Sequence, residues 1–297
     1  MTQPIRCVTV PVLATASLIL VLGGCGDLLD PEVYGDLTPE TFFSNEEDFK
    51  NAVVALYAPF STHWGNTDQG VGEWYNNLYN HHTTTYWARS EIPTDEMFSP
   101  WDPVFNNFDW GPTTFNGDPT YTKIRYVARA TDIIDKIETS SAPISDAVRA
   151  RYEAEARTLR AWLMYAMYDF FGPVNVKLDP ATLSDTEITP RPSREEYVSA
   201  MVEDLTSAIP DLPERVSGED WGRIAKGTAR MILLRVHMHE KNWAAAEAVA
   251  RDIEGMGYSL MSEYSDVCNV QENEEIIYAV PANASSPNWY WQEITPS

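Results

Sequence analysis

Cysteine is scarce in this chain, which has three cysteines among 297 residues. Cys7 and Cys25 lie close to the N-terminus, and Cys268 lies near the other end. Cys7 falls inside an expected leader peptide and Cys25 is expected to carry a lipid, so Cys268 has no partner for a disulfide within the mature chain. The hydrophobic core must therefore hold the fold unaided, which is feasible because a chain of this size buries most of its apolar surface.

Basic side chains are also few. The chain has 21 Lys and Arg residues against 44 Asp and Glu residues, and its formal net charge is -23 at pH 7. Because phosphate groups repel such an acidic body, the composition argues against nucleic acid and against anionic lipid headgroups as partners. It suits neutral or cationic ligands instead.

Motifs for metal, phosphate or nucleophile chemistry are missing as well. His81 and His82 are adjacent, and His237 and His239 are two apart on a predicted helix, so in both pairs the side chains point apart. Neither pair has the spacing of a zinc site. The sequence has no glycine-rich phosphate loop and no Gly-x-Ser-x-Gly elbow. We therefore predict neither a metal ion nor a cofactor.

The N-terminus has the order of parts of a secretory signal. Arg6 gives a positive start, and an apolar run over residues 8–22 follows, interrupted by Pro11. A membrane span needs about 20 apolar residues, so this shorter run matches the hydrophobic region of a cleaved signal better. We therefore predict a signal peptide over residues 1–24.

Cys25 follows directly after the signal, preceded by Leu22-Gly23-Gly24. Two small residues before a cysteine, with leucine ahead of them, form the bacterial lipobox, where a diacylglyceryl group is attached to the thiol. The alternative is an ordinary cleaved signal, or a short anchor helix, with an incidental cysteine. The presence of all parts in the right order favours the lipobox. We predict an exported lipoprotein anchored through Cys25, with the anchor and tether over residues 25–37.

The rest of the chain carries mainly helical periodicity. A short helix is predicted to open at Thr38-Pro39, and a capping-box pattern at residues 44–47 precedes the next helix. A long helix is predicted to end at Gly172-Pro173, and another to begin at Ser193, capped by Glu196. The side chains expected on inward faces are Phe49, Ala52, Val53, Leu56, Phe60, Ile124, Val127, Thr131, Ile134, Tyr152, Ala156, Leu159, Leu163, Ala166, Phe170, Val198, Met201, Leu205, Ala208, Ala225, Ala229, Ile232, Leu233, Val236, Trp243, Ala246, Ala250 and Ile253.

The last two predicted helices meet at a tight Lys241-Asn242 turn. They have the small-residue contacts of a tetratricopeptide-type hairpin. One strand is predicted over residues 275–280, bounded by Pro281. The expected fold is therefore mainly α, with tetratricopeptide-like helical hairpins, few short strands and a long irregular insertion rich in aromatic residues.

That insertion, residues 61–120, has no sustained period and is far longer than an ordinary loop. Long irregular segments inside compact domains are usually functional or disordered, and aromatic content argues against disorder. Aromatic rings beside Asn and Asp match the apolar C–H face and the hydroxyl rim of a sugar. The competing interpretation is that these rings pack the segment onto the helices. The aromatic and polar residues concerned are Trp64, Trp74, Tyr75, Asn76, Asn77, Tyr79, Asn80, Tyr86, Trp87, Asp95, Trp101, Phe105, Asn106, Asn107, Phe108, Asp109 and Trp110.

We predict a ligand site within this aromatic segment. Trp101 ranks first as a stacking platform, because Pro100 and Asp102-Pro103 stiffen the loop around it. The full set of candidates consists of Trp74, Trp87, Trp101 and Trp110 as platforms, with Asp95 and Asn107 as hydrogen-bonding neighbours.

Acid–base catalysis is the other chemistry that this segment offers. Glu91, Asp95 and Glu96 lie within it, and a glycoside hydrolase needs only two carboxylates across a sugar. Solvated surface charge is the favoured interpretation of these carboxylates. We therefore predict that the protein is not an enzyme.

Several motifs, in their order along the chain, resemble the SusD/RagB family of nutrient-binding outer-membrane lipoproteins from Bacteroidota. Residues 27–31 and 37–43 are similar to the opening of that family, and Glu155-x-Arg157-x-x-Arg160-Ala161 with the exit turn at residues 169–174 is similar to its most recognisable helix. Further similar stretches are Ala55-Leu56-Tyr57, Arg191-Pro192-Ser193, Asp204-Leu205, Leu212-Pro213, residues 222–226, Trp243-x-x-Ala246, Gly257-Tyr258 and Asn273-x-Glu275-Ile276-Ile277. No single motif is decisive, but their order over residues 25–280 is specific.

The chain departs from the family pattern at Asn175, where a second proline of the exit turn is usual, and at Thr131, where asparagine is common. Family members generally continue well past Ile276. The resemblance therefore covers the N-terminal part of the family. It implies that residues 38–297 form a SusD-like helical domain without much of the family's C-terminal half.

The resemblance implies a lipoprotein on the surface of the outer membrane that captures a glycan or a peptide. It further implies a partner, a SusC-like TonB-dependent transporter, and no bond chemistry. Cys25 is the one position that the resemblance transfers. Two other functions stay open: a secreted helical glycoside hydrolase, and a tetratricopeptide-type adaptor that binds only another protein.

Overall fold

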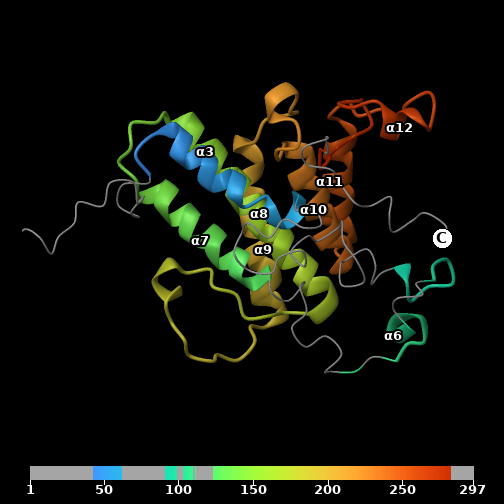
Figure 1. Ribbon diagram of the computed structural model, residues 1–297, viewed down its shortest axis with the longest axis horizontal. Helices are drawn as coiled ribbons and strands as arrows, with labels where there is room; N and C mark the ends of the chain where they lie inside the picture. The colour runs from blue at the N-terminus through green and yellow to red at the C-terminus, as the bar shows by residue number, and fades with distance from the viewer. Residues whose placement is uncertain (1–42, 62–90, 99–102, 110, 112–122, 282–297) are drawn as a thin grey trace, which may run out of the picture. The chain divides into compact units, whose positions relative to one another are not determined.

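The computed structural model describes residues 43–61, 91–98, 103–109, 111 and 123–281, and these residues are mainly helical (Figure 1). The α-helices are α3 (Glu46–Ala55), α4 (Ala58–Ser61), α6 (Pro103–Asn106), α7 (Ile124–Thr139), α8 (Asp146–Phe171), α9 (Arg194–Ala208), α10 (Lys226–His239), α11 (Trp243–Glu254) and α12 (Asp266–Asn269). Short 3-10 turns are η3 (Pro180–Thr182), η4 (Ile209–Asp211) and η5 (Gly218–Asp220). The predicted mainly α fold is confirmed.

Helix α8 is the central helix of this scaffold. It packs along both α7 and α9, and it also contacts α3 and α10, while α10 and α11 pair as the next hairpin (Figure 1). Its middle is buried nearly all round, as expected of a helix enclosed by others. The buried side chains between Leu159 and Tyr168 are Leu159, Arg160, Ala161, Leu163, Met164, Tyr165, Ala166, Met167 and Tyr168.

Local sequence signals set the ends of these helices. The Ser193 hydroxyl accepts the N–H of Glu196 at 3.2 Å, and the Glu196 carboxylate accepts the N–H of Ser193 at 2.8 Å, which confirms the predicted capping box of α9. Helix α8 ends as predicted at Gly172, whose φ of 66 lies in the left-handed region that favours glycine. The box of α3 is shifted by one residue from the prediction, because Asn45 is the cap and Asp48 closes it.

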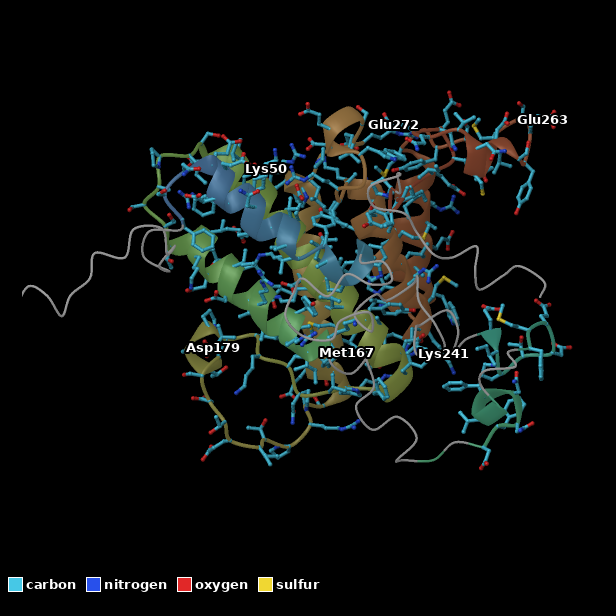
Figure 2. All side chains as sticks on the ribbon, in the orientation of Figure 1. Lys50, Met167, Asp179, Lys241, Glu263 and Glu272 are labelled. Atoms are coloured by element: carbon cyan, nitrogen blue, oxygen red, sulfur yellow. The ribbon has the colours of Figure 1, made fainter. Side chains whose placement is uncertain are left out.

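The core follows the predicted periodicity closely. Leu159, Leu163 and Val236 are at most 1% exposed, and the other inward residues expected on α3, α7, α9 and α10 are buried or half-buried. Figure 2 shows the side chain of Met167 packed within the helices, whereas Asp179 and Glu263 lie on outlying loops. The hydrophobic core thus lies between α8 and the helices around it.

Two predictions on this part of the chain are wrong. Trp243, expected inside, is 61% exposed, because it is the first residue of α11 and Ala246 and Ile253 form the buried face of that helix. Residues 275–280, predicted to form a strand, have irregular structure and pair with no strand among the described residues. Instead, the carbonyl oxygen of Ile277 accepts the hydroxyl of Thr228 on α10 at 3.3 Å.

A further prediction concerns residues that the structure does not describe. The helix predicted to open at Thr38-Pro39 lies outside the described residues. None of the helices that the structure describes is long and apolar enough to cross a membrane.

Candidate functional site

Most of the predicted ligand residues lie outside the part of the chain that the structure describes. These are the four platforms Trp74, Trp87, Trp101 and Trp110, and the lipid-bearing Cys25 lies outside it as well. The two polar candidates are described, and both Asp95 and Asn107 are exposed to solvent. The structure therefore leaves the predicted tryptophan platforms as a prediction.

Within the described parts of the aromatic segment, one aromatic side chain packs in a core and another is exposed to solvent. Phe105 of α6 is 6% exposed and forms a small core with Ile92, whereas Phe108 is 64% exposed with a left-handed φ of 55. Asp95 and Glu96 are exposed within one short turn, in which the Thr94 hydroxyl donates to the carbonyl of Glu91. This arrangement fits solvated surface charge.

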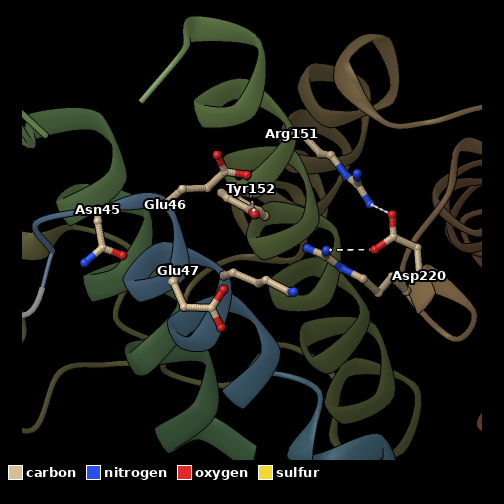
Figure 3. A pocket seen from close by; sticks show the side chains of 8 residues that line it. Asn45, Glu46, Glu47, Arg151, Tyr152 and Asp220 are labelled. Atoms are coloured by element: carbon tan, nitrogen blue, oxygen red, sulfur yellow. Dashed lines mark hydrogen bonds and ion pairs between the residues drawn. The ribbon is translucent and has the colours of Figure 1, made fainter. Parts of the chain in front are cut away.

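A charged hollow of about 500 Å³ lies where α3, the start of α8 and η5 meet (Figure 3). Its lining residues are Asn45, Glu46, Glu47, Lys50, Arg151, Tyr152, Asp220 and Arg223. Arg151 points toward Asp220 (Figure 3) and donates to its carboxylate at 2.7 Å, and Arg223 donates to the same carboxylate at 3.1 Å. Burial tends to raise the pKa of Asp220, but hydrogen bonds from the two arginines lower it below its ordinary value.

Glu155 lies beneath this hollow and is fully buried. Its carboxylate accepts hydrogen bonds from Tyr57 Oη at 2.8 Å, Arg223 Nε at 3.1 Å and Arg151 Nε at 3.2 Å. Arg223 Nη2 is 2.9 Å from Oε1 but is not aligned for a hydrogen bond. Tyr57 Oη also accepts the N–H of Ile224 at 2.9 Å. One buried carboxylate therefore joins the turn between α3 and α4, helix α8 and the segment that leads into α10.

The ionisation of this pair follows from its surroundings. Loss of hydration raises the pKa of Glu155, and Arg223 opposes that effect. Burial would lower the pKa of Arg223, but the Glu155 carboxylate raises it well above its ordinary value. Because a guanidinium group keeps its proton in proteins, Arg223 remains charged, and the carboxylates of Glu155 and Asp220 compensate its charge.

A second buried ion pair joins α8 to α9. Arg160 donates two parallel hydrogen bonds, of 2.7 and 2.8 Å, to the carboxylate of Asp204. This is the bidentate geometry in which such pairs are strongest. Arg157 adds a contact of 3.2 Å to the same carboxylate. The Thr131 hydroxyl of α7 accepts a hydrogen bond from Arg160 at 3.0 Å and donates to the carbonyl of Lys177 at 2.7 Å. The Arg160–Asp204 pair, together with Thr131, therefore joins α7, α8 and α9.

An aromatic groove of about 500 Å³ lies between α8, α10 and residues 275–280. The Trp162 ring is 5.1 Å from the ring of Tyr278, edge to face at 76°, and 4.7 Å from that of Phe60. The residues that line this aromatic groove are Trp162, Tyr165, Thr228, Met231, Ile232, Arg235, Glu275, Ile277, Tyr278 and Val280. Its floor is mostly apolar, with one basic and one acidic side chain at its edge.

A third hollow, of about 820 Å³, lies between α9 and the turn that joins α10 to α11. Arg194 and Glu240 bridge it with an ion pair of 2.8 Å, and Val198 and Val202 give it a small apolar strip. Within the described ranges, no group of three or more His, Cys, Asp or Glu side chains is placed to hold a metal ion.

Known proteins with similar sequences are SusD-like. The chain is 25% identical over 272 residues to a SusD-like protein from Formosa agariphila, covering 89% of this chain and 50% of that protein. It is 27% identical over 282 residues to a SusD-like protein from Bacteroides ovatus, covering 88% and 47%. A third relative, the starch-binding protein SusD of Bacteroides thetaiotaomicron, is 22% identical and covers 70% and 37%.

Solved structures share the fold. A laminarin-binding SusD-like protein matches with a TM-score of 0.59 at 21% identity, covering 80% of this chain and 51% of that chain. Surface glycan-binding protein A from Bacteroides thetaiotaomicron, in complex with laminarihexaose, matches with a TM-score of 0.58 at 21% identity, covering 75% and 46%. The chain is therefore similar to SusD-like proteins in both sequence and fold. No model of a protein family matches the chain, and the chain spans about half the length of the first curated relatives it matches.

The motif that carried the resemblance to SusD-like proteins proves to be structural in this chain. Glu155, Arg157 and Arg160 all belong to the two buried ion clusters, and none of them lines the aromatic groove. The two residues that depart from the family pattern also have structural contacts. Thr131 accepts a hydrogen bond from Arg160, and the side-chain amide of Asn175 donates to the carbonyl of Thr189. The motif therefore marks how the helices are joined.

The aromatic groove was missed by the sequence analysis. Trp162 and Tyr165 fall three residues apart on α8 and lie on one helix face, but they stand in a run that is otherwise core. Arg235 on α10 is the only charged residue within the apolar stretch from Met231 to Val236. Arg235 was therefore the sequence signal that could have indicated this groove.

Proposed function

We propose that this chain acts in nutrient capture, as a lipoprotein at the surface of the outer membrane that binds a glycan and delivers it to a SusC-like TonB-dependent transporter. The relationship in sequence to SusD-like proteins over 88–89% of the chain carries this proposal. One relative is named a starch-binding protein, and structures with the same fold are named for laminarin and for laminarihexaose. Aromatic side chains, which suit sugar rings, make up 12% of the sequence.

The proposed domain organisation comprises a signal peptide at 1–24, an anchor and tether at 25–37, and a SusD-like helical domain at 38–297. The role is binding without catalysis. Two buried carboxylates, Glu155 and Asp204, are paired with arginines inside the scaffold. A hydrolase would release reducing ends from starch or laminarin, and an adaptor would bind neither polysaccharide.

The purified full chain is expected to bind laminarin or starch, and Trp101→Ala is expected to weaken that binding. Loss of a stacking platform at a binding hot spot costs about 2 kcal/mol, roughly a 30-fold loss in affinity. Affinity electrophoresis in gels that contain the polysaccharide measures the change, and thermal melting is recorded in parallel. Trp243→Ala is the matched control, because Trp243 is exposed on α11 outside the aromatic segment. Unchanged affinity together with a lowered melting temperature for Trp101→Ala makes Trp101 a core residue and removes it from the site.

Anchoring by lipid is tested at Cys25. Cys25→Ala is expected to leave the protein unacylated and to release it from the membrane fraction, because a protein without its acyl chains loses its hydrophobic hold on the bilayer. Fractionation and metabolic labelling with a fatty acid measure both effects. Cys268→Ala serves as the control, since Cys268 is exposed and lies far along the chain. An unchanged membrane-bound fraction for Cys25→Ala would refute the anchor.

A further inference from the structure

The floor of the aromatic groove is a pair of rings held by their own packing. Trp162 is fixed on one side by Phe60 and meets Tyr278 edge to face, so its orientation is set before any ligand arrives. Tyr165, 8% exposed, and Met231 extend the apolar surface along α8 and α10. A platform that is already rigid loses little conformational entropy on binding.

The edge of the groove offers one hydrogen-bond donor group and one acceptor group. Arg235 is exposed and makes no hydrogen bond or ion pair within the described part of the chain, although acidic residues outnumber basic ones 44 to 21. Glu275 accepts the N–H of Met261 through Oε2 at 2.9 Å, which leaves Oε1 as an acceptor. Thr228 is already engaged by the carbonyl of Ile277. The groove therefore combines an apolar floor with a guanidinium and a carboxylate oxygen that can meet a ligand.

We propose that the aromatic groove binds a sugar unit of a neutral oligosaccharide, with its C–H face on the Trp162 ring, its edge against Tyr278 and its hydroxyl groups at Arg235 and Glu275. This inference rests on the proposed function, and it adds a site distinct from the tryptophans of residues 61–120. A volume of about 500 Å³ is that of a small-molecule pocket, which is typically mostly apolar with a few placed polar groups.

The charges of the groove select the ligand class. A hydroxyl group both donates and accepts, so a sugar satisfies Arg235 and Glu275 at once. An acidic sugar would gain from Arg235 but would be repelled by Glu275 and by a chain with a net charge of -23. A purely apolar ligand would desolvate both charged groups without compensation. A neutral glycan is therefore the class of ligand that suits both Arg235 and Glu275.

The test measures binding of laminarihexaose, maltohexaose and an oligogalacturonate to the full chain by calorimetry. Arg235→Met keeps an unbranched apolar stem and removes the guanidinium group, and it is expected to weaken binding of the neutral sugars by roughly tenfold or more. Met231→Trp is expected to fill the groove and to abolish that binding. Arg129→Met is the control, since Arg129 is also exposed but lies on α7. Thermal melting shows whether each variant is folded.

The possible results distinguish the proposed groove site from the proposed function in glycan capture. Weakened binding in the two groove variants, with Arg129→Met unaffected, supports the site. Binding of a neutral glycan that neither groove variant changes overturns the site and leaves the proposed function standing. Tighter binding of oligogalacturonate than of both neutral sugars, dependent on Arg235, overturns the neutral ligand class. Failure of the unaltered chain to bind any of the three overturns the proposed function and the groove together.

Discussion

Glu155→Gln is expected to lower the free energy of unfolding by about 3–5 kcal/mol, the usual effect of removing one partner of a buried ion pair. Glu155 is 0% exposed, and the side chain of Arg223 is 11% exposed. The substitution keeps the size of the side chain but removes the buried carboxylate beside Arg223, which then keeps the partly exposed Asp220 as its ion-pair partner among the described residues. Urea unfolding followed by circular dichroism measures the change.

Glu247→Gln is the matched control for this substitution. Glu247 and Arg251 form an exposed pair on α11, with side chains 64% and 71% exposed, and such pairs contribute only about 0.5 kcal/mol or less. Arg223→Met in the Glu155→Gln background is expected to recover part of the loss, because both charges are then gone. Equal costs for Glu155→Gln and Glu247→Gln would show that the buried pair has no special weight.

Leu163→Ala is expected to cost about 2–5 kcal/mol of stability, because it empties a space that the surrounding helices cannot fully close. Leu163 is 0% exposed in the middle of α8, where α7 and α9 pack on either side. Leu260→Ala is the control, since Leu260 is 84% exposed and leaves no cavity. Denaturant midpoints at unchanged m-values measure the two effects. A cost near zero for Leu163→Ala contradicts the placement of the core.

Periodicity and capping signals were sufficient to predict the helical scaffold. Ser193 with Glu196, and Gly172 with its left-handed φ, are local devices whose effect does not depend on distant residues. Trp243 shows where such reasoning ends, because its spacing on α11 is that of an inward residue while nothing described covers it. A helical pattern states which residues share a face, and only tertiary packing decides how far that face is buried.

The strand expected at 275–280 failed for a related reason. A β-strand needs a partner for its backbone groups, and an apolar run cannot show from its own sequence whether one exists. Here Ile277 and Tyr278 face the helices instead and line the aromatic groove. The groove was invisible to the sequence because Trp162 and Tyr278 are 116 residues apart, and only the fold brings them within 5.1 Å.

The hydroxyl of Tyr57 has a consequence for how this scaffold opens. It joins residues 98 and 167 positions away, Glu155 and Ile224, in one buried cluster. Stacked helical repeats usually touch only their neighbours and so can fray one unit at a time. In this chain the cluster spans the turn between α3 and α4, helix α8 and the entrance to α10, so local opening of any one of these segments breaks contacts with the other two. The amide of Ile224 should then exchange its hydrogen only when the scaffold unfolds as a whole.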